Sequence, residues 1–426
     1  MKIFFYTLGC KVNQYESQVA EEIFESRGHI ITNKVAESDV AVVNSCTVTA
    51  ESDRKSRQAV RRFKKSNPDR IVILMGCMPS AIPETTEKLP EADIVIGNVN
   101  PSGIADLLDE FLEKRERIVR IDRHEKDETY STPSITKFSD RTRAFMKVQD
   151  GCDRYCTYCL IPYARGHIRS RELDSIKKEA ESLAKNGFRE IVLVGINLTS
   201  FGKENGLDIS DAVKAAAVDG IERVRLGSIE PDHMSDELLK KLKAEPKFCP
   251  QFHLALQSGS DKTLKRMNRH YDTAFFSDLV DRIRKNFENA SITTDIMVGF
   301  PGESEADFSE SRDFLLKIGF ARSHVFAYSK RSGTVAAGLP KQVEECEKTK
   351  RASLMADAAR KAETNFLKTQ VGRTETVLFE READGFYEGY TANYTRVKVE
   401  SKRDISGMIL PVLITSAEDD FCFGKI

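Results

Sequence analysis

Short apolar runs alternate with polar or charged helical stretches along the first hundred residues. The apolar runs cover residues 2–8, 40–43, 71–75 and 94–96, and the helical stretches between them include residues 14–27 and 49–65. Strands alternating with helices at a spacing of about 30 residues are typical of a parallel α/β sheet. The pattern therefore predicts an N-terminal α/β domain over residues 1–112.

A second and longer alternation begins after residue 143. Helical stretches such as residues 175–186, 235–243 and 275–286 separate its apolar runs. The predicted strands are residues 145–148, 191–194, 224–226, 252–256, 293–298 and 324–327. This series of βα units predicts a partial or complete (β/α) barrel over residues 143–338. Its site is expected in the loops at the carboxyl ends of the strands.

The remaining segments connect or follow these two α/β parts. Residues 113–142 are charged and carry Thr and Pro, which predicts a linker. Residues 339–370 contain a long charged helical stretch that predicts a connecting helix. Residues 371–426 are rich in Val, Thr, Tyr and Phe with Gly turns, which predicts a small antiparallel β-barrel of OB type. No apolar run approaches the ~20 residues of a transmembrane helix, so we expect no membrane partner.

Charge and cysteine content narrow the class of protein. The 65 Lys+Arg and 66 Asp+Glu leave a net charge of −1, which argues against a uniformly basic coat but not against local patches. Nine cysteines are an odd count that fits poorly with a fully paired disulfide framework, and the first residues lack a secretory signal pattern. We therefore expect a cytoplasmic protein with reduced thiols. In such proteins clustered cysteines favour metal binding or catalysis.

Three cysteines follow successive predicted strands of the N-terminal domain. Cys10, Cys46 and Cys77 are separated by about one βα unit each, and Gly precedes two of them. Because the carboxyl ends of parallel strands share one edge of a sheet, these thiols are expected to meet there. A single Cys in such a place is often only a buried side chain. Three in succession favour a shared metal site.

Three more cysteines follow the first predicted barrel strand. Cys152, Cys156 and Cys159 form the pattern C-x3-C-x2-C. A structural zinc site needs a fourth ligand, usually from a second pair, and none is evident. Three thiolates can instead hold a four-iron cluster and leave one iron open for a substrate or cosubstrate. The other reading is a zinc loop or a chance spacing.

With this loop at the first strand of a barrel, the sequence resembles the radical S-adenosylmethionine (SAM) superfamily. The matching segments outside the cysteine loop are residues 161–166, 170–171, 195–197, 228–231, 256–260 and 295–303. The whole chain resembles the methylthiotransferase family, whose members have an N-terminal domain with three cysteines, a radical SAM barrel and a C-terminal TRAM domain. Residues 7–17 look most like the branch that methylthiolates threonylcarbamoyladenosine just 3′ of the tRNA anticodon. The branches acting on isopentenyladenosine in tRNA or on a ribosomal protein typically carry other residues there.

The resemblance implies two [4Fe-4S] clusters and SAM as cofactors. It implies that Cys152, Cys156 and Cys159 hold the cluster that cleaves SAM to a 5′-deoxyadenosyl radical, which takes hydrogen from C2 of adenine. It assigns Cys10, Cys46 and Cys77 to a second cluster that carries the sulfur. The implied partners are the tRNA anticodon stem-loop, a flavodoxin- or ferredoxin-like electron donor and a sulfur source. It also places Tyr158 near the adenine of SAM.

Four polar residues at predicted strand ends are candidates for contact with SAM or the nucleoside. They are Asn197, Glu230, Gln257 and Asp295. Polar groups in such places also serve in turns or in the packing of a barrel. The remaining cysteines, Cys249, Cys346 and Cys422, are scattered and are expected to be structural.

Local basic patches are candidates for RNA contact. Residues 51–65 hold seven Lys+Arg against two acids, and residues 141–171 hold the same numbers around the second cysteine loop. Phosphate contacts beside the chemistry are what a folded RNA substrate needs, although charged helix faces are common without RNA. The C-terminal segment 367–426 has eight Lys+Arg against ten acids, which leaves only a one-sided strip there. The residues assigned to RNA are Arg54, Lys55, Arg57, Arg165, Arg169, Arg171, Arg396 and Lys398.

Two other functions remain open on sequence alone. A methylthiotransferase could act on isopentenyladenosine or on a ribosomal protein. A noncatalytic iron–sulfur protein could bind RNA and sense redox state, although a sensor has no need for a barrel of this size. Reductive cleavage of SAM separates the enzyme from the sensor.

Overall fold

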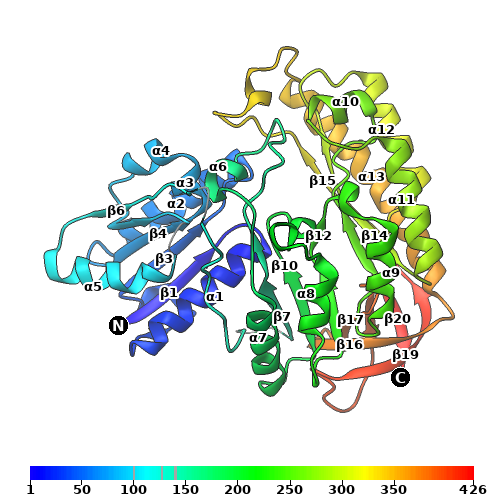
Figure 1. Cartoon of the computed structure of the whole chain (residues 1–426), viewed down its shortest axis with the longest axis horizontal. Coiled ribbons are helices and arrows are strands. Elements are labelled where there is room, and N and C mark those ends of the chain that lie inside the picture. Colours follow the sequence, from blue (N-terminus) through cyan, green and yellow to red (C-terminus); the bar gives the residue numbers. More distant parts are fainter. Residues whose placement is uncertain (99–100, 126–127, 139–141) are drawn as a thin grey trace.

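The N-terminal part is a parallel sheet flanked by helices, drawn in blue and cyan in Figure 1. The computed structural model describes residues 1–98, 101–125, 128–138 and 142–426. The strands are β1 (Lys2–Thr7), β2 (Ile30–Ile31), β3 (Val40–Ser45), β4 (Ile71–Gly76), β5 (Ile94–Ile96) and β6 (Ile118–Arg120), in the spatial order β2-β1-β3-β4-β5-β6. The helices are α1 (Lys11–Ser26), α2 (Ala50–Ser66), α3 (Cys77–Ala81), α4 (Pro83–Glu87) and α5 (Ile104–Lys114). The four strands predicted here are confirmed.

The edges of this sheet extend beyond what the sequence pattern indicated. Strand β2 has two residues, and β6 pairs with β5 within the segment expected to be a linker. Residues 121–125 and 128–138 form no helix or strand, yet Ile135 and Phe138 are buried in the core of the central domain. The described part of the linker is therefore packed against both neighbours.

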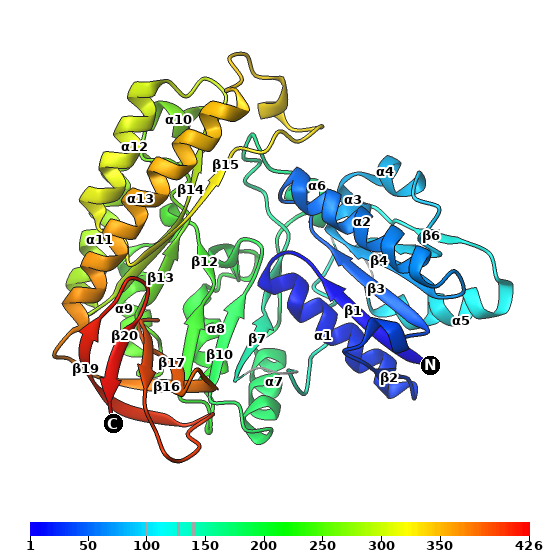
Figure 2. The ribbon, with the colours of Figure 1, turned by 180° about the vertical axis from the view of Figure 1, so that it is seen from behind.

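Helix α1 joins the N-terminal sheet to the central domain. Its Ala20 and Phe24 are buried in the core of the N-terminal sheet, whereas Val12, Tyr15 and Val19 belong to the central core. Both views show α1 between the two sheets (Figures 1 and 2). Burial on two faces fixes the amino end of α1 at the opening of the central barrel.

The central domain is an open barrel of parallel strands, and the six strands predicted for it are confirmed. The strands are β7 (Arg143–Lys147), β10 (Glu190–Val194), β11 (Arg223–Leu226), β12 (Ser228–Ile229), β13 (Gln251–Leu254), β14 (Ser291–Val298) and β15 (Arg322–Ala327). They form the sheets β11-β10-β7 and β12-β13-β14-β15, which meet around Gly227. A small antiparallel pair, β8 (Gln149–Asp150) and β9 (Arg169–Ser170), brackets the second cysteine loop.

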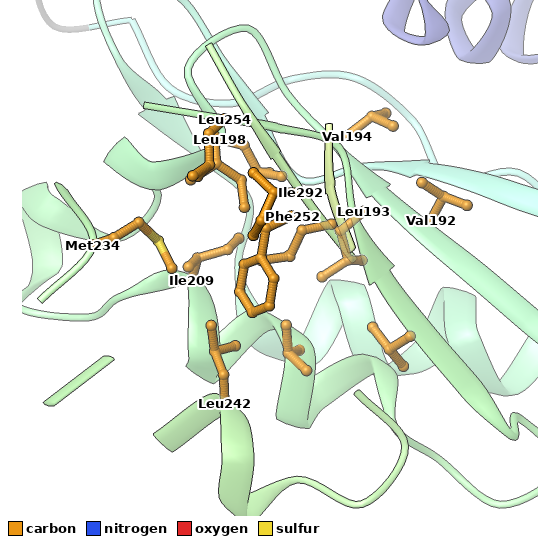
Figure 3. Packing of buried hydrophobic residues seen from close by; sticks show 14 of the residues in the cluster. Val192, Leu193, Val194, Leu198, Ile209, Met234, Leu242, Phe252, Leu254 and Ile292 are labelled. Carbon is orange, nitrogen blue, oxygen red and sulfur yellow. The ribbon is translucent and has the colours of Figure 1, made fainter. Parts of the chain in front are cut away.

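Helices cover the outside of this barrel. They are α7 (Leu173–Lys185), α8 (Ile209–Ala216), α9 (Asp236–Ala244), α10 (Asp261–Arg266), α11 (Thr273–Asn286) and α12 (Glu305–Ile318). The short helix α6 (Ile161–Arg165) lies instead against α3, at the boundary with the N-terminal domain (Figure 1). Figure 3 shows Leu193, Phe252 and Ile292 from the strands packed against Ile209 and Leu242 from the helices. All five side chains are fully buried, and each such burial contributes about 1.5–3 kcal/mol.

The C-terminal part consists of one long helix and a closed barrel. Helix α13 (Glu345–Gln370) lies along α12 and β15 at the outer side of the central domain (Figure 2). The barrel strands are β16 (Thr374–Ala383), β17 (Phe386–Thr391), β18 (Arg396–Val399), β19 (Ile409–Ala417) and β20 (Cys422–Lys425), in the closed order β16-β17-β18-β20-β19. All pairs are antiparallel except β18 with β20. This confirms the small OB-like barrel.

None of the helices in the described ranges has both the length and the apolar character needed to cross a membrane.

Candidate functional site

Cys10, Cys46 and Cys77 lie at the carboxyl ends of three neighbouring strands. Cys10 directly precedes α1, Cys46 follows β3, and Cys77 begins α3 after β4. Because β1, β3 and β4 are adjacent and parallel, the three thiols gather at one edge of the sheet. Cys46 and Cys77 are buried and Cys10 is exposed. The structure therefore brings this predicted trio together.

Two glycines with positive φ let the strand ends approach so closely. Gly9 has φ +104°, and a Cβ there would lie 2.8 Å from the Cβ of Cys46. Gly76 has φ +98°, and a Cβ there would lie 2.5 Å from Oδ1 of Asn44. A side chain at Gly9 would displace Cys46, and one at Gly76 would displace Asn44 or the backbone of Ser45.

Buried amides and a hydroxyl fasten the three strand ends to one another. Asn13 on α1 donates from Nδ2 to Oδ1 of Asn44 at 3.0 Å and to the carbonyl of Ser45 at 3.0 Å. Ser45 Oγ donates to the carbonyl of Met75 at 2.6 Å. Cys10 Sγ lies 3.2 Å from Oδ1 of Asn13. These bonds fix the relative positions of the cysteine-bearing turns before any metal is bound.

A buried arginine from the central domain reaches the first trio. Arg165, in α6 directly after the second cysteine loop, donates from Nε to Cys77 Sγ at 3.3 Å. Its Nη1 and Nη2 bind the carboxylate of Glu16 on α1 at 2.7 and 2.8 Å. Lys147 on β7 also binds Glu16 at 2.8 Å, and both cations contact Asp150. The first cysteine site is thus braced by an ion network that crosses the domain boundary.

Cys152, Cys156 and Cys159 lie in the loop after β8, and two hydrogen bonds shape this loop. The amide of Cys152 donates to the carbonyl of Gly166 at 3.0 Å, and that of Cys159 to the carbonyl of Cys156 at 3.0 Å. Arg269 donates from Nη1 to Cys156 Sγ at 3.3 Å and pairs with Glu230. Each trio therefore has one buried arginine that bonds a cysteine sulfur and is held by a glutamate.

The chemistry of the donor sets fits iron–sulfur clusters. Burial raises the pKa of Cys77, Cys152 and Cys159 to about 12, so these thiols become ligands only when a metal displaces the proton. Within the described residues, no three His, Cys, Asp or Glu side chains converge on a site for a single metal ion. A structural zinc site takes four protein ligands, whereas a four-iron cluster takes one thiolate at each iron. Each trio therefore fits a four-iron cluster with one iron left open.

Two of the residues predicted to contact SAM lie beside the second cysteine loop. Tyr158 packs edge-on against Phe300, with ring centroids 6.3 Å apart. Glu230 is half-buried and holds Arg269 and Arg154 over the loop. Tyr158 is part of the loop by sequence, and the structure brings Glu230 next to it.

Two others lie near strand ends of the barrel and have features typical of ligand sites. Asn197 is 4% exposed, and neither its Oδ1 nor its Nδ2 has a partner among the described residues. Gln257 is a buried non-glycine residue at φ +67°, a strained conformation that persists where function requires it. A buried amide without partners costs about 1–3 kcal/mol, which a bound ligand would offset.

Asp295 lies in the middle of β14 and not at the strand end expected from the sequence. It lines a cavity of about 650 Å³ inside the barrel, beneath Cys10, and its carboxylate is 3.3 Å from Nε2 of His253. Burial would raise the pKa of Asp295, but its bond to His253 lowers it, and nearby His324 and Lys11 add to this effect. Asp295 therefore faces the cavity, while its carbonyl accepts from the amide of Gln257 at 2.9 Å.

The assignment of Arg165, Arg169 and Arg171 to RNA is wrong. The three side chains are at most 6% exposed. Arg169 faces Asp150 at 3.6 Å, and Arg171 binds Glu179 at 2.7 Å. These arginines balance buried carboxylates inside the protein, so RNA phosphates cannot reach them. Arg141, counted in the same patch, is outside the described residues.

The other RNA candidates lie nearer the surface. Arg54 and Lys55 are exposed on α2 and Arg57 is half-buried there, while Arg54 pairs with exposed Glu51. Arg396 and Lys398 on β18 bind Glu388 at 2.8 and 3.1 Å. The strip on the C-terminal barrel is therefore largely neutralised, whereas α2 keeps exposed positive charge beside Cys46.

The scattered cysteines occupy separate places. Cys249 is buried beside Arg225, Cys422 is buried in the core of the C-terminal barrel, and Cys346 is exposed on α13. None of the three joins either trio.

Sequence reasoning missed the residues that brace the cysteines. Asp150 and Arg269 lie outside the matching segments. Glu16 lies within residues 7–17 but had no predicted role, and Arg165 was assigned to RNA. Glu16 lies far from Arg165 along the chain, so only the folded structure shows the pairing. The one signal in the sequence for these bracing residues was the presence of charged residues shortly after a cysteine, as with Glu16 after Cys10 and Arg165 after Cys159.

Comparison with known proteins agrees with this arrangement of domains. Residues 146–315 match the model of the Radical SAM superfamily, and residues 2–97 match that of the Uncharacterized protein family UPF0004. Among solved structures, the radical S-adenosylmethionine methyltransferase TsrM from Kitasatospora setae, with cobalamin and a [4Fe-4S] cluster bound, is similar with a TM-score of 0.59. At 14% identity over 91% of this chain and 80% of that one, the likeness concerns the fold alone.

Curated relatives match the chain over nearly its full length. The threonylcarbamoyladenosine tRNA methylthiotransferase MtaB of Bacillus subtilis is 36% identical over 97% of this chain and 93% of its own length. The protein of the same name from Aquifex aeolicus is also 36% identical, over 97% of this chain and its full length. The tRNA-2-methylthio-N(6)-dimethylallyladenosine synthase of Pelotomaculum thermopropionicum is 32% identical over 96% and 94%.

Proposed function

Because the chain belongs to the radical SAM methylthiotransferase family, we propose that it methylthiolates tRNA at C2 of N6-threonylcarbamoyladenosine, just 3′ of the anticodon. The observation that carries this proposal is the pair of three-cysteine sites, one on each side of the boundary between the N-terminal and central domains. Two sites with three thiolates each leave one open iron each. A redox sensor would not need that arrangement together with a barrel.

The cysteines divide into two roles. Cys152, Cys156 and Cys159 would hold the cluster that binds SAM, and Cys10, Cys46 and Cys77 the cluster that carries sulfur. When bound, these groups supply the electron that cleaves SAM and the methylthio group that reaches C2. A flavodoxin- or ferredoxin-like reductant and an external sulfur source complete the reaction.

The protein's own side chains position these components. Arg165 and Arg269 donate to Cys77 and Cys156, which stabilises the negative charge of ligating thiolates. The unpartnered amide of Asn197 offers a donor and an acceptor to SAM. Tyr158, next to Cys159, packs near the expected position of the adenine.

The RNA substrate would approach over α2. Exposed Arg54 and Lys55 lie on the helix that follows Cys46, so phosphate contacts there would bring the anticodon loop to the first cysteine site. The target base has to leave the stack of the anticodon loop so that its C2 atom can lie between the two cysteine sites.

The substrate assignment is tested by deletion of the gene and mass spectrometry of tRNA nucleosides. The 2-methylthio derivative of threonylcarbamoyladenosine should disappear while its precursor accumulates. If the 2-methylthio derivative of isopentenyladenosine disappears instead, the chain belongs functionally with the dimethylallyladenosine relatives.

The division of roles is tested with purified, reconstituted variants. Cys10→Ala should abolish methylthiolation and retain some cleavage of SAM to 5′-deoxyadenosine, whereas Cys156→Ala should lose both. Equal loss of SAM cleavage in the two variants would contradict the assignment.

A further inference from the structure

The cavity inside the barrel opens beneath the first cysteine site. The inner faces of the central strands, the amino end of α1 and Tyr394 of the C-terminal barrel enclose about 650 Å³. Of the six cysteines in the two trios, Cys10 alone is among the described residues that line it. This volume is typical of a pocket for a small organic group.

The wall of this cavity carries an excess of positive charge. Lys11, Arg143, Arg225 and Arg322 line it, and Asp295 is the one carboxylate among its described lining residues. Asp295, which also contacts His253 at 3.3 Å, supplies one negative charge against four cations, so an excess of positive charge remains. The cavity is therefore electrostatically suited to an anion and unsuited to a purely apolar group.

Two of the four cations are already engaged. Arg225 donates from Nε to Glu190 at 2.9 Å, and Arg143 binds Glu380 at 2.8 Å. Both guanidinium groups also lie over the ring of Tyr394, at 4.7 and 4.9 Å from its centroid. These two arginines are therefore held in place at the contact between the central domain and the C-terminal barrel.

The other two keep most of their charge available. Lys11 directly follows Cys10, its side chain is exposed to the cavity, and its Nζ lies 5.8 Å from the ring centroid of Phe145. No ion pair of Lys11 occurs within the described ranges. Arg322 is half-exposed and reaches Glu363 only at 4.0 Å.

We propose that Lys11, assisted by Arg322, binds the carboxylate of the threonylcarbamoyl group, so that this substituent extends from the adenine at Cys10 into the barrel cavity. The inference rests on the proposed function and names the residues that select its substrate. An isopentenyl group has no charge to offer, and its insertion would leave Lys11 desolvated without a partner. The same residue would therefore favour one modified adenosine and disfavour the other.

The test compares two anticodon stem-loop RNAs, one with threonylcarbamoyladenosine and one with its neutral carboxamide. The reconstituted wild-type protein should bind and methylthiolate the acid about 10- to 100-fold better, as expected for one charge-assisted hydrogen bond. Lys11→Met should lower the affinity for the acid by a similar factor and leave the carboxamide nearly unchanged. Lys11→Arg should keep the preference for the acid.

Controls separate this role from damage to the neighbouring cluster and from binding of SAM. Lys88→Met removes an exposed lysine of the same domain and should change neither affinity. Iron content and the KM for SAM should be unchanged in Lys11→Met. If the KM for SAM rises instead, the cavity binds the carboxylate of SAM and the proposal fails.

The outcomes distinguish the inference from the function on which it rests. If the wild-type protein binds acid and carboxamide equally, or if Lys11→Met weakens both equally, the carboxylate is not read by Lys11. If the wild-type protein prefers the acid but methylthiolates neither RNA, the proposed function fails while the binding site stands. If Lys11→Met loses iron, the two RNAs are still compared with the wild-type protein, and equal binding of both RNAs there rules the proposal out.

Discussion

The buried ion network between α1 and the central domain leads to a quantitative prediction. Glu16 is 4% exposed, and its two oxygens accept bonds from Arg165 and Lys147 at 2.7–2.8 Å. Glu16→Gln keeps the shape of the side chain but removes the charge, leaving Asp150 to balance both cations and neighbouring Arg169. Loss of one partner of a buried ion pair costs about 3–5 kcal/mol because the other charge stays desolvated.

Urea unfolding of the full chain followed by circular dichroism measures this cost. The free energy of unfolding of the transition that includes the N-terminal domain should fall by about 3–5 kcal/mol. Glu51→Gln is the matched control, because its partner Arg54 is on the surface and such pairs contribute about 0–1 kcal/mol. A change in Glu16→Gln no larger than in this control would refute the reasoning.

The same variant should also affect the first cysteine site. Arg165 is held by Glu16 and donates to Cys77, so loss of the glutamate charge frees its guanidinium to move. We expect iron bound by the N-terminal domain to dissociate faster in Glu16→Gln, measured by capture with a chelator. Unchanged dissociation together with lowered stability would limit the network to holding the domains together.

Three other predictions follow from the site. Burial would raise the pKa of Glu16, but the opposing effect of Arg165 and Lys147 is larger, so the pKa in the folded protein is lowered. The stabilisation by the Glu16 carboxylate is therefore complete above about pH 4.3, its pKa in the unfolded chain, and is lost as the pH falls further. Thermal unfolding should thus be more sensitive to acid in the wild-type protein than in Glu16→Gln. Gly9→Ala places a methyl group against Cys46 and should lower bound iron from about eight to about four atoms per chain in elemental analysis. Arg269→Met should slow formation of 5′-deoxyadenosine about 10- to 100-fold while Lys88→Met does not.

The sequence predicted the elements whose apolar runs are long. Strands β3 and β4 are six residues each and fully buried, which produces the continuous apolar runs of interior parallel strands. Strands β2, β8, β9 and β12 have two residues each, too few to show any periodicity. Strand β6 is partly exposed at the sheet edge, where its residues need no apolar pattern.

The same logic explains how far the site could be predicted. Cysteines at strand ends were recognisable because the order of strands alone brings them together. Asp295 and Glu230 were both expected near strand ends, but only Glu230 follows a strand, whereas Asp295 lies in the middle of β14. Which of them faces the second cysteine loop and which faces the cavity depends on how the two sheets of the barrel meet around Gly227.

Charge is the property that local sequence predicted least well, and the two basic patches show why. On α2, exposed Arg54 and Lys55 face Glu51 of the same helix, so their balance is local. Lys64 instead binds Asp93 outside the patch, and the counted acid Asp53 is buried against Arg331. In residues 141–171 the cations are balanced by Glu16 and Glu179, which lie outside the patch and meet it only after folding. A cluster of cations that flanks a buried site therefore indicates an internal ion network as readily as an RNA surface. Within the described residues of these two patches, the exposed Arg54 and Lys55 lie on α2, so phosphate contacts should be sought there.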